Sequence, residues 1–198
     1  MKRISRAGVL AGALAFVMLG SGASAAAPSS PRGEGGDEVI TVEEFFTPGP
    51  ETVVKLNADY AGPTLPGIKA AFRDTLVPTV KNVKYQGQQC GTTLIQQTSG
   101  RGKTTLVMTV EKSVAATTKK EASIDLKFIS AGMGWDVTKT YTVKNETRYE
   151  VPAGKFGTVQ AYPLFEQYQG TAFDRFGTPL GNVYAYKPVG VCFNQHLK

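Results

Sequence analysis

The residue types that perform acid–base or nucleophilic catalysis are few in this sequence and do not cluster. The only histidine is His196, two residues from the C-terminus, where we expect a frayed tail. Serine and cysteine nucleophiles both need a positioned base. Two carboxylates could hydrolyse a glycosidic bond, but the candidate acids are scattered over separate predicted strands and loops: Asp136, Glu146, Glu150, Glu166 and Asp174. The sequence therefore predicts a protein that is not an enzyme, with no catalytic residue.

Phosphate and metal sites have equally little support. The string Gly100-Arg101-Gly102-Lys103-Thr104 resembles the end of a phosphate loop, but it lacks the first glycine at the required spacing and precedes a predicted strand. We interpret it as a turn. Zinc sites need several histidine or cysteine ligands, and no such group exists here. We expect no metal and no cofactor.

Aromatic residues are the remaining candidates for a binding site, and they are dense in the last third of the chain. An exposed aromatic group of this kind binds carbohydrate or lipid headgroups, whereas a buried one forms the core at one end of the sheet. Trp135 either anchors at a membrane interface or caps that core. The candidate surface consists of Trp135, Tyr162, Phe165, Tyr168, Tyr184 and Tyr186.

The N-terminus reads as a secretory signal peptide spanning 1–25. A basic start is followed by the apolar run 7–20 and by Ala23-Ser24-Ala25, a small-residue cleavage site. The apolar run is short for a membrane span, although an uncleaved anchor is the alternative. We expect a secreted, extracellular protein whose mature chain starts at Ala26.

Charge and cysteine content fit export. The chain has 22 basic and 16 acidic residues, and removing the three basic residues of the leader leaves 19 against 16. That excess is too small to indicate nucleic-acid binding, and it suits either an anionic envelope surface or simple solubility. The two cysteines, Cys90 and Cys192, are predicted to form a disulfide because paired cysteines in exported chains usually do.

Composition divides the rest of the chain into three parts. Residues 26–37 are rich in Pro, Ser and Gly and read as a flexible linker. Residues 38–78 read as an N-terminal arm and small cap, with a short helix at 67–75. Residues 79–198 read as an elongated β domain.

Alternation of polar and apolar residues predicts long β-strands in that domain. It is clear over 103–114, continues over 122–130 after a charged turn at 117–121, and is longest over 137–151. A further strand is predicted at 156–165, with Pro163 placing it near a sheet edge, followed by a shorter pair at 167–173 and 181–191. The fold class is therefore all-β, an elongated antiparallel sheet with long strands.

One strand-turn-strand stretch carries a family resemblance. Alternating threonines lead to a turn at Val151, Pro152, Gly154 and Lys155, and a return strand follows. This pattern, over about 103–165, resembles the aerolysin and epsilon-toxin family of β-pore-forming proteins, which has a VPPGK-like turn between long polar-faced strands. Ala153 departs from that turn, where the family has a second proline. The string is also similar to a group of secreted Gram-positive bacterial proteins that carry V-P-x-G-K-x-G…A-Y-P-L. This second similarity points to no particular activity.

The resemblance implies that an amphipathic hairpin refolds into a membrane barrel. The candidate hairpin spans 108–130, with its tip at 117–121. Its lipid-facing residues would be Met108, Val110, Val114, Ile124, Leu126 and Phe128, since a barrel needs apolar residues toward lipid and polar residues toward the lumen. Lys112 interrupts the apolar face.

Two functions are consistent with these observations. The first is a secreted non-enzymatic protein, similar to a β-pore-forming module, that binds a cell surface or membrane and oligomerises. The alternative is a binding or adaptor subunit of an extracellular toxin or envelope assembly, whose arm at 38–56 pairs with a protein partner by strand addition.

Overall fold

The computed structural model of the protein describes residues 39–64 and 77–198. The predicted signal peptide at 1–25, the linker at 26–37 and the short helix at 67–75 lie outside the described residues. The elements are β1 (Phe45–Phe46), β2 (Thr52–Leu56), β3 (Thr79–Gly91), β4 (Gln96–Arg101), β5 (Thr104–Ala115), β6 (Thr117–Lys120), α1 (Leu126–Met133), β7 (Thr140–Val151), β8 (Phe156–Phe173) and β9 (Pro179–Leu197). The all-β prediction and the antiparallel pairing are confirmed.

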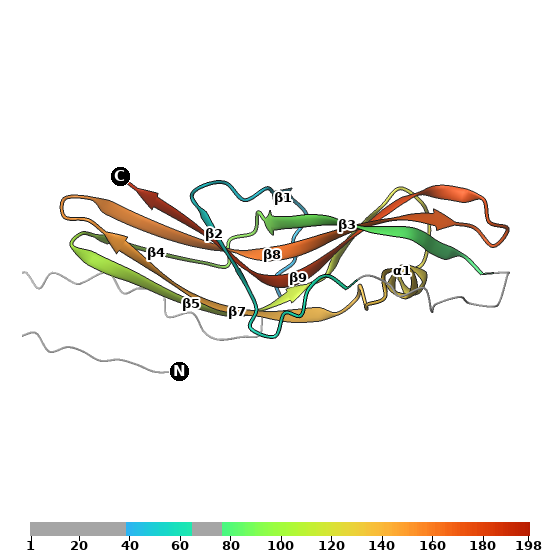
Figure 1. Cartoon of the computed structure of the whole chain (residues 1–198), viewed down its shortest axis with the longest axis horizontal. Helices are drawn as coiled ribbons and strands as arrows, with labels where there is room; N and C mark the ends of the chain where they lie inside the picture. Colours follow the sequence, from blue (N-terminus) through green and yellow to red (C-terminus); the bar gives the residue numbers. More distant parts are fainter. Residues whose placement is uncertain (1–38, 65–76) are drawn as a thin grey trace, which may run out of the picture. The chain divides into compact units, whose positions relative to one another are not determined.

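The two longest strands, β8 and β9, form one antiparallel hairpin that carries the larger sheet (Figure 1). They have 18 and 19 residues, and their register runs from Gly157 opposite Leu197 to Phe173 opposite Pro179. The sequence interpretation divided this hairpin into a strand at 156–165 and a shorter pair at 167–173 and 181–191, which is wrong. A register shift after Leu164 keeps the ladder continuous where the alternation changes phase.

The other edge of β8 is shared by two strands. β4 pairs with the first part of β8, as far as Ala161, and β3 pairs with the last part, from Leu164 onward. Pro163 lies in the gap between them, where its missing N–H has no ladder partner to satisfy. The prediction that Pro163 marks a sheet edge is therefore wrong, because β8 is a central strand.

The N-terminal arm completes this sheet within the same chain. β2 pairs with the last residues of β9, and β1 pairs with the end of β3. β6 adds to the other half of β9. Gly190 is required beside β2, because a Cβ there would lie 2.1 Å from the carbonyl oxygen of Lys55. The arm's backbone thus already has intramolecular partners.

Within the described residues the smaller sheet consists of β5 and β7, in unbroken antiparallel register from Thr104 opposite Val151 to Ala115 opposite Thr140, and Ile40 adds one isolated parallel bridge to Val114. One face carries threonines and charged residues and is exposed, as the alternation predicted. The other face packs on the larger sheet and forms a core with it: Leu106, Met108, Val110, Val114, Val143 and Val151 meet Val159, Ala161, Phe165, Val191 and Phe193.

The predicted hairpin over 108–130 is not present in the structure. Met108, Val110 and Val114 lie buried on β5, but Ile124 lies in a loop, and Leu126 and Phe128 lie on α1. The helix forms because Ile129 and Met133, four residues apart, bury one face completely. Gly134 ends the helix at a φ of 77°. The spacing of Ile124, Leu126 and Phe128 suggested a strand. The burial of Ile129 and Met133 in the core stabilises a helix there instead.

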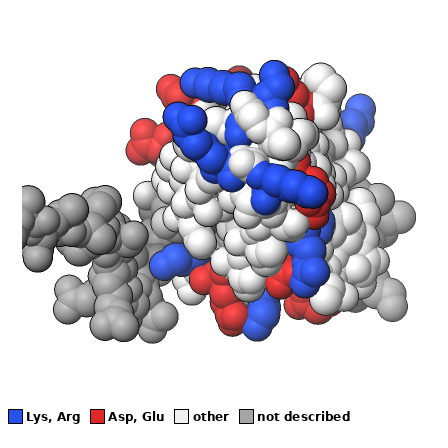
Figure 2. All heavy atoms as spheres, turned by 90° about the vertical axis from the view of Figure 1, so that its left-hand side faces the viewer, with Lys and Arg blue, Asp and Glu red and all other residues white. Residues whose placement is uncertain are grey.

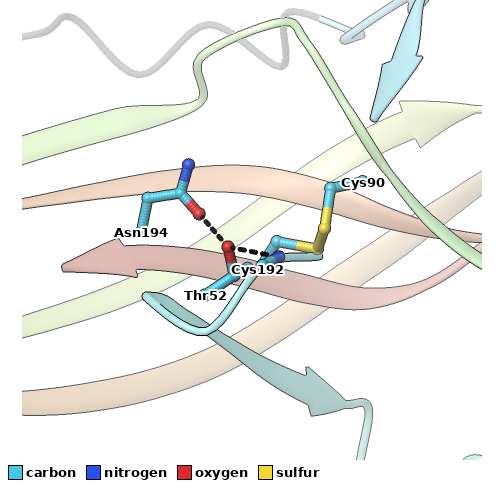
Figure 3. Close-up of a disulfide and its surroundings, with 5 residues drawn as sticks. Thr52, Cys90, Cys192 and Asn194 are labelled. Atoms are coloured by element: carbon cyan, nitrogen blue, oxygen red, sulfur yellow. Dashed lines mark hydrogen bonds between the residues drawn. A yellow bond between two sulfur atoms is a disulfide. The ribbon is translucent and has the colours of Figure 1, made fainter. Parts of the chain in front are cut away.

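The disulfide is confirmed. Cys90 on β3 and Cys192 on β9 are joined across the outer side of β8, with a Cα–Cα distance of 6.0 Å, and both are fully buried (Figure 3). Beside the bridge, the hydroxyl of Thr52 donates to the side-chain oxygen of Asn194 at 2.6 Å. The bridge and this bond hold β2, β3 and β9 together at one point.

Replacing Cys90 and Cys192 by Ala is expected to lower the free energy of unfolding by about 4 kcal/mol, because the bridge closes a long loop in the unfolded chain. The sequence separation is 102 residues. Urea denaturation of the variant and of the oxidised and reduced wild type measures this. A loss below about 1 kcal/mol would contradict the role assigned to the bridge.

Candidate surface-binding site

The predicted aromatic surface is mostly core. Phe165 and Tyr168 are fully buried, and Trp135 and Tyr186 are nearly so, whereas Tyr162 and Tyr184 are half-buried. The prediction that these four buried residues form a binding surface is therefore wrong. Phe165 and Tyr186 pack against Phe45 in an aromatic group, and Trp135 packs against Tyr168.

The turn at Val151, Pro152, Gly154 and Lys155 is instead a crossover between the two sheets. The Lys155 N–H donates to the Pro152 carbonyl at 3.2 Å, and Gly154 takes the φ of 79° that the third residue of a type II turn requires. β7 belongs to the small sheet and β8 to the large one. The turn therefore moves the chain from one layer to the other.

A second crossover runs beside the first. Gly102 and Lys103 lead from β4 in the large sheet to β5 in the small one. The Gly102 N–H donates to the Lys155 carbonyl at 2.9 Å, and a Cβ at Gly102 would lie 1.8 Å from the Pro152 carbonyl oxygen. Only glycine allows this approach, so the two crossovers are locked together.

We call the surface formed here the crossover end, and it lies at the left of Figure 1, where the C-terminus also lies. Its members are Arg101, Lys103, Lys155, Phe156, Leu197 and Lys198, all of them exposed.

Strand register places three of these residues in one row. Arg101 is the β4 partner of Phe156, and Phe156 and Lys198 exchange two backbone hydrogen bonds of 2.8 Å. Directly opposed residues share a face of the sheet. The neighbouring Gly157 faces the small sheet, since a Cβ on it would meet Val151. The row Arg101, Phe156, Lys198 therefore points to the outer, solvent face.

The cations of the crossover end have no acidic partner within the described residues. The nearby acids are engaged elsewhere: Glu51 lies 2.8 Å from Nδ1 of His196, and Glu150 accepts a bond of 2.7 Å from Thr105. Figure 2 looks onto this end and shows Lys and Arg side chains across it. Phe156 and Leu197 add apolar surface, with 39% and 44% exposure.

His196 is not on a frayed tail, as the sequence suggested. It lies in β9 opposite Thr158. The sequence interpretation also missed Arg101, Lys103, Leu197 and Lys198 as one site. The string G-R-G-K-T was noticed as a turn, but nothing in the sequence places it against Lys155 or the end of β9.

A buried carboxylate forms the main polar group of the interior. Glu166 is fully buried on β8, and its carboxylate accepts hydrogen bonds from the hydroxyls of Tyr60 and Tyr168, the latter at 2.7 Å. The Tyr168 oxygen accepts in turn from the Thr64 N–H at 3.0 Å. Burial raises the pKa of Tyr168 and of Tyr60, and the bond to Glu166 raises both further. This arrangement fastens the segment 57–64 to the sheet.

Within the described residues no cluster of His, Cys, Asp and Glu has the makings of a metal site. None of the helices described has the length and hydrophobicity to cross a membrane.

Comparison with known proteins adds little to this geometry. No family model and no curated protein matches the chain. Among solved structures, the lamprey immune protein is similar at 14% sequence identity and a TM-score of 0.30, covering 62% of this chain and 53% of that one. A match of this quality carries no argument about fold or function.

Replacing Tyr168 by Phe is expected to make the free energy of unfolding fall less steeply as the pH rises above about 10. The unfolded tyrosine ionises near pH 10, and the raised native pKa means that its stabilisation is complete below that pH and is lost as the pH rises above it. One such group adds a slope of about 1.4 kcal/mol per pH unit. Urea denaturation at a series of pH values measures this slope for the wild type and for the Tyr168→Phe variant. Equal slopes above pH ~10 would contradict this account.

Proposed function

We propose that this is an exported, non-enzymatic protein that binds an anionic lipid surface through the crossover end. The observation that carries the proposal is the exposed row Arg101, Phe156, Lys198 with Lys103 and Lys155 beside it. The disulfide and the predicted signal peptide support export, because such bridges persist in oxidising compartments.

The chemistry of the crossover end fits a membrane better than a polar ligand. Basic residues near an anionic bilayer each contribute about 1 kcal/mol of attraction, and apolar side chains enter the headgroup region. Here Phe156 and Leu197 share the crossover end with four cations that have no acidic partner among residues 39–64 and 77–198. Two glycine-dependent crossovers hold them in place, so little ordering accompanies binding.

Replacing Lys103 and Lys155 by Ser is expected to weaken binding to vesicles of phosphatidylglycerol and phosphatidylcholine by about 30-fold, the loss of two such attractions. Co-sedimentation measures this. Lys84→Ser with Lys139→Ser is the matched control, because it removes two exposed lysines elsewhere and should change binding far less.

Three results would reject the proposal: no binding by the wild type, equal binding to pure phosphatidylcholine, or equal loss in both double variants. Binding to a protein from an envelope fraction with none to vesicles would favour the adaptor function. Its arm would then have to leave β3 and β9 to add to a partner.

The separate β5–β7 sheet favours pore formation as a second candidate, in keeping with the aerolysin-like turn. Its strands have 12 residues each, and a membrane-spanning strand needs about 9–11. One face is apolar and the other polar, and no ladder within the described residues joins it to the large sheet. Lys112, Asn145 and Thr147 interrupt the apolar face. This pair replaces 108–130 as the segment that would insert.

Joining β7 to β9 is expected to abolish dye release from vesicles if the β5–β7 sheet inserts. Thr147 Oγ1 and Gln195 Nε2 are 3.3 Å apart, so Thr147→Cys with Gln195→Cys can be bridged by a short bis-maleimide, and the native cysteines are already paired. The single-cysteine variants, treated with the same reagent, are the controls. Release that persists after bridging would contradict insertion, as would no release by the wild type at concentrations where it binds.

A further inference from the structure

The β8–β9 hairpin ends in an exposed aromatic tip. Phe176 is 74% exposed, more than any other large hydrophobic side chain described, and Leu180 nearby is 43% exposed. The guanidinium of Arg175 lies 4.7 Å from the centre of the Phe176 ring. A large apolar side chain held in water at the end of a long hairpin indicates a contact surface.

The turn that carries Phe176 is held in one conformation. The Asp174 carboxylate accepts the N–H groups of Phe176 and Thr178, both at 2.8 Å. The Asp174 N–H donates to the Thr178 carbonyl at 2.9 Å, and Gly177 takes a φ of 86°. These bonds fix the backbone that carries Phe176, and the side chain itself lies in solvent.

The tip, like the crossover end, has basic side chains beside exposed apolar ones, although fewer of them. Arg175 has no acidic partner within the described residues, and neither has Lys81, whose ammonium lies 5.5 Å from the Phe173 ring. Two carboxylates lie nearby and keep their charge: Asp174 accepts the N–H groups that close the turn, and Glu121 accepts from the Asn182 N–H at 3.0 Å. The attraction to an anionic surface therefore depends on Arg175, which lies against the exposed Phe176 ring. Cations beside exposed apolar groups again suit an anionic headgroup layer.

The two surfaces lie at opposite ends of the same strands. β8 begins at Phe156 in the crossover end and finishes at Phe173 beside the tip. Its 18 residues span about 60 Å at the rise of a β-strand. One flat membrane cannot meet both ends of an upright hairpin of that length.

We propose that the Arg175–Phe176 tip is a second site for anionic lipid, so that one molecule bridges two membranes. This rests on the proposed function for the first contact. The tip adds a second, weaker contact, with fewer cations than the crossover end. The protein would therefore cluster anionic vesicles as a monomer, without a second copy at the junction.

The test compares binding and clustering on the same vesicles. The full mature chain is mixed with phosphatidylglycerol–phosphatidylcholine vesicles, with co-sedimentation for binding and light scattering for clustering. Arg175→Ser with Phe176→Ser should weaken binding by no more than about fivefold, the loss of one cation, and should abolish clustering. Lys84→Ser with Leu94→Ser, an exposed pair elsewhere, should leave both unchanged.

The outcomes separate the two proposals. Binding without clustering by the wild type overturns bridging and leaves the proposed function standing, whereas no binding removes the proposed function itself. Clustering that persists in the tip variant also overturns bridging through the tip and indicates that a second copy makes the junction. Bridging through the tip is supported if the tip variant loses clustering but retains binding and the matched control is unchanged.

Discussion

The β8–β9 ladder is the constraint on which every other element depends. Each strand of the larger sheet pairs with one of these two or, in the case of β1, with a strand that does. The small sheet packs on one face of the hairpin, at Val159, Ala161 and Phe165. The helix α1 packs at Tyr168 and Ala172, which take the alternate positions of β8 and so face the other side. A ladder of this length is formed by residues that are adjacent in sequence around one turn, so the pairing starts locally. The two candidate contact surfaces then lie at its two ends because the strands themselves fix where those ends are.

The basic side chains of the crossover end are exposed because the chain passes there from one sheet to the other. Backbone leaving one sheet for another must satisfy its polar groups without a ladder. Here it does so by packing two connections against each other, with Gly102 donating to Lys155. The carbonyl of Pro152 lies where any side chain at Gly102 would be. Side chains are pushed outward as a result, and the basic residues at these positions face solvent together.

The buried carboxyl group of Glu166 is a source of instability that nearby hydrogen bonds offset. A carboxylate without water is strongly destabilising unless it is hydrogen-bonded. Glu166 meets this requirement through Tyr60 and Tyr168, which come from the strap at 57–64 and from β8 itself. The same strap caps the free edge of β7, since Asn57 accepts from the Lys144 N–H and donates to the Thr142 carbonyl. One short segment thus covers both the buried carboxyl group of Glu166 and the open edge of β7, and it links the two sheets.

The sequence by itself determined the fold class, the alternation of β5 and β7, and the pairing of Cys90 with Cys192. Period-two patterning, and an even cysteine count in a chain predicted to be exported, are local or compositional signals, and they need no tertiary information. Only the tertiary structure decided that 126–133 is a helix, because burial of Ile129 and Met133 outweighs a short strand-like pattern. It also decided that Pro163 is central, since the gap between β3 and β4 depends on which strands meet there. The tertiary structure likewise decided the crossover end, because its residues come from three separate parts of the chain, and strand register and the packing of the two crossovers bring them together.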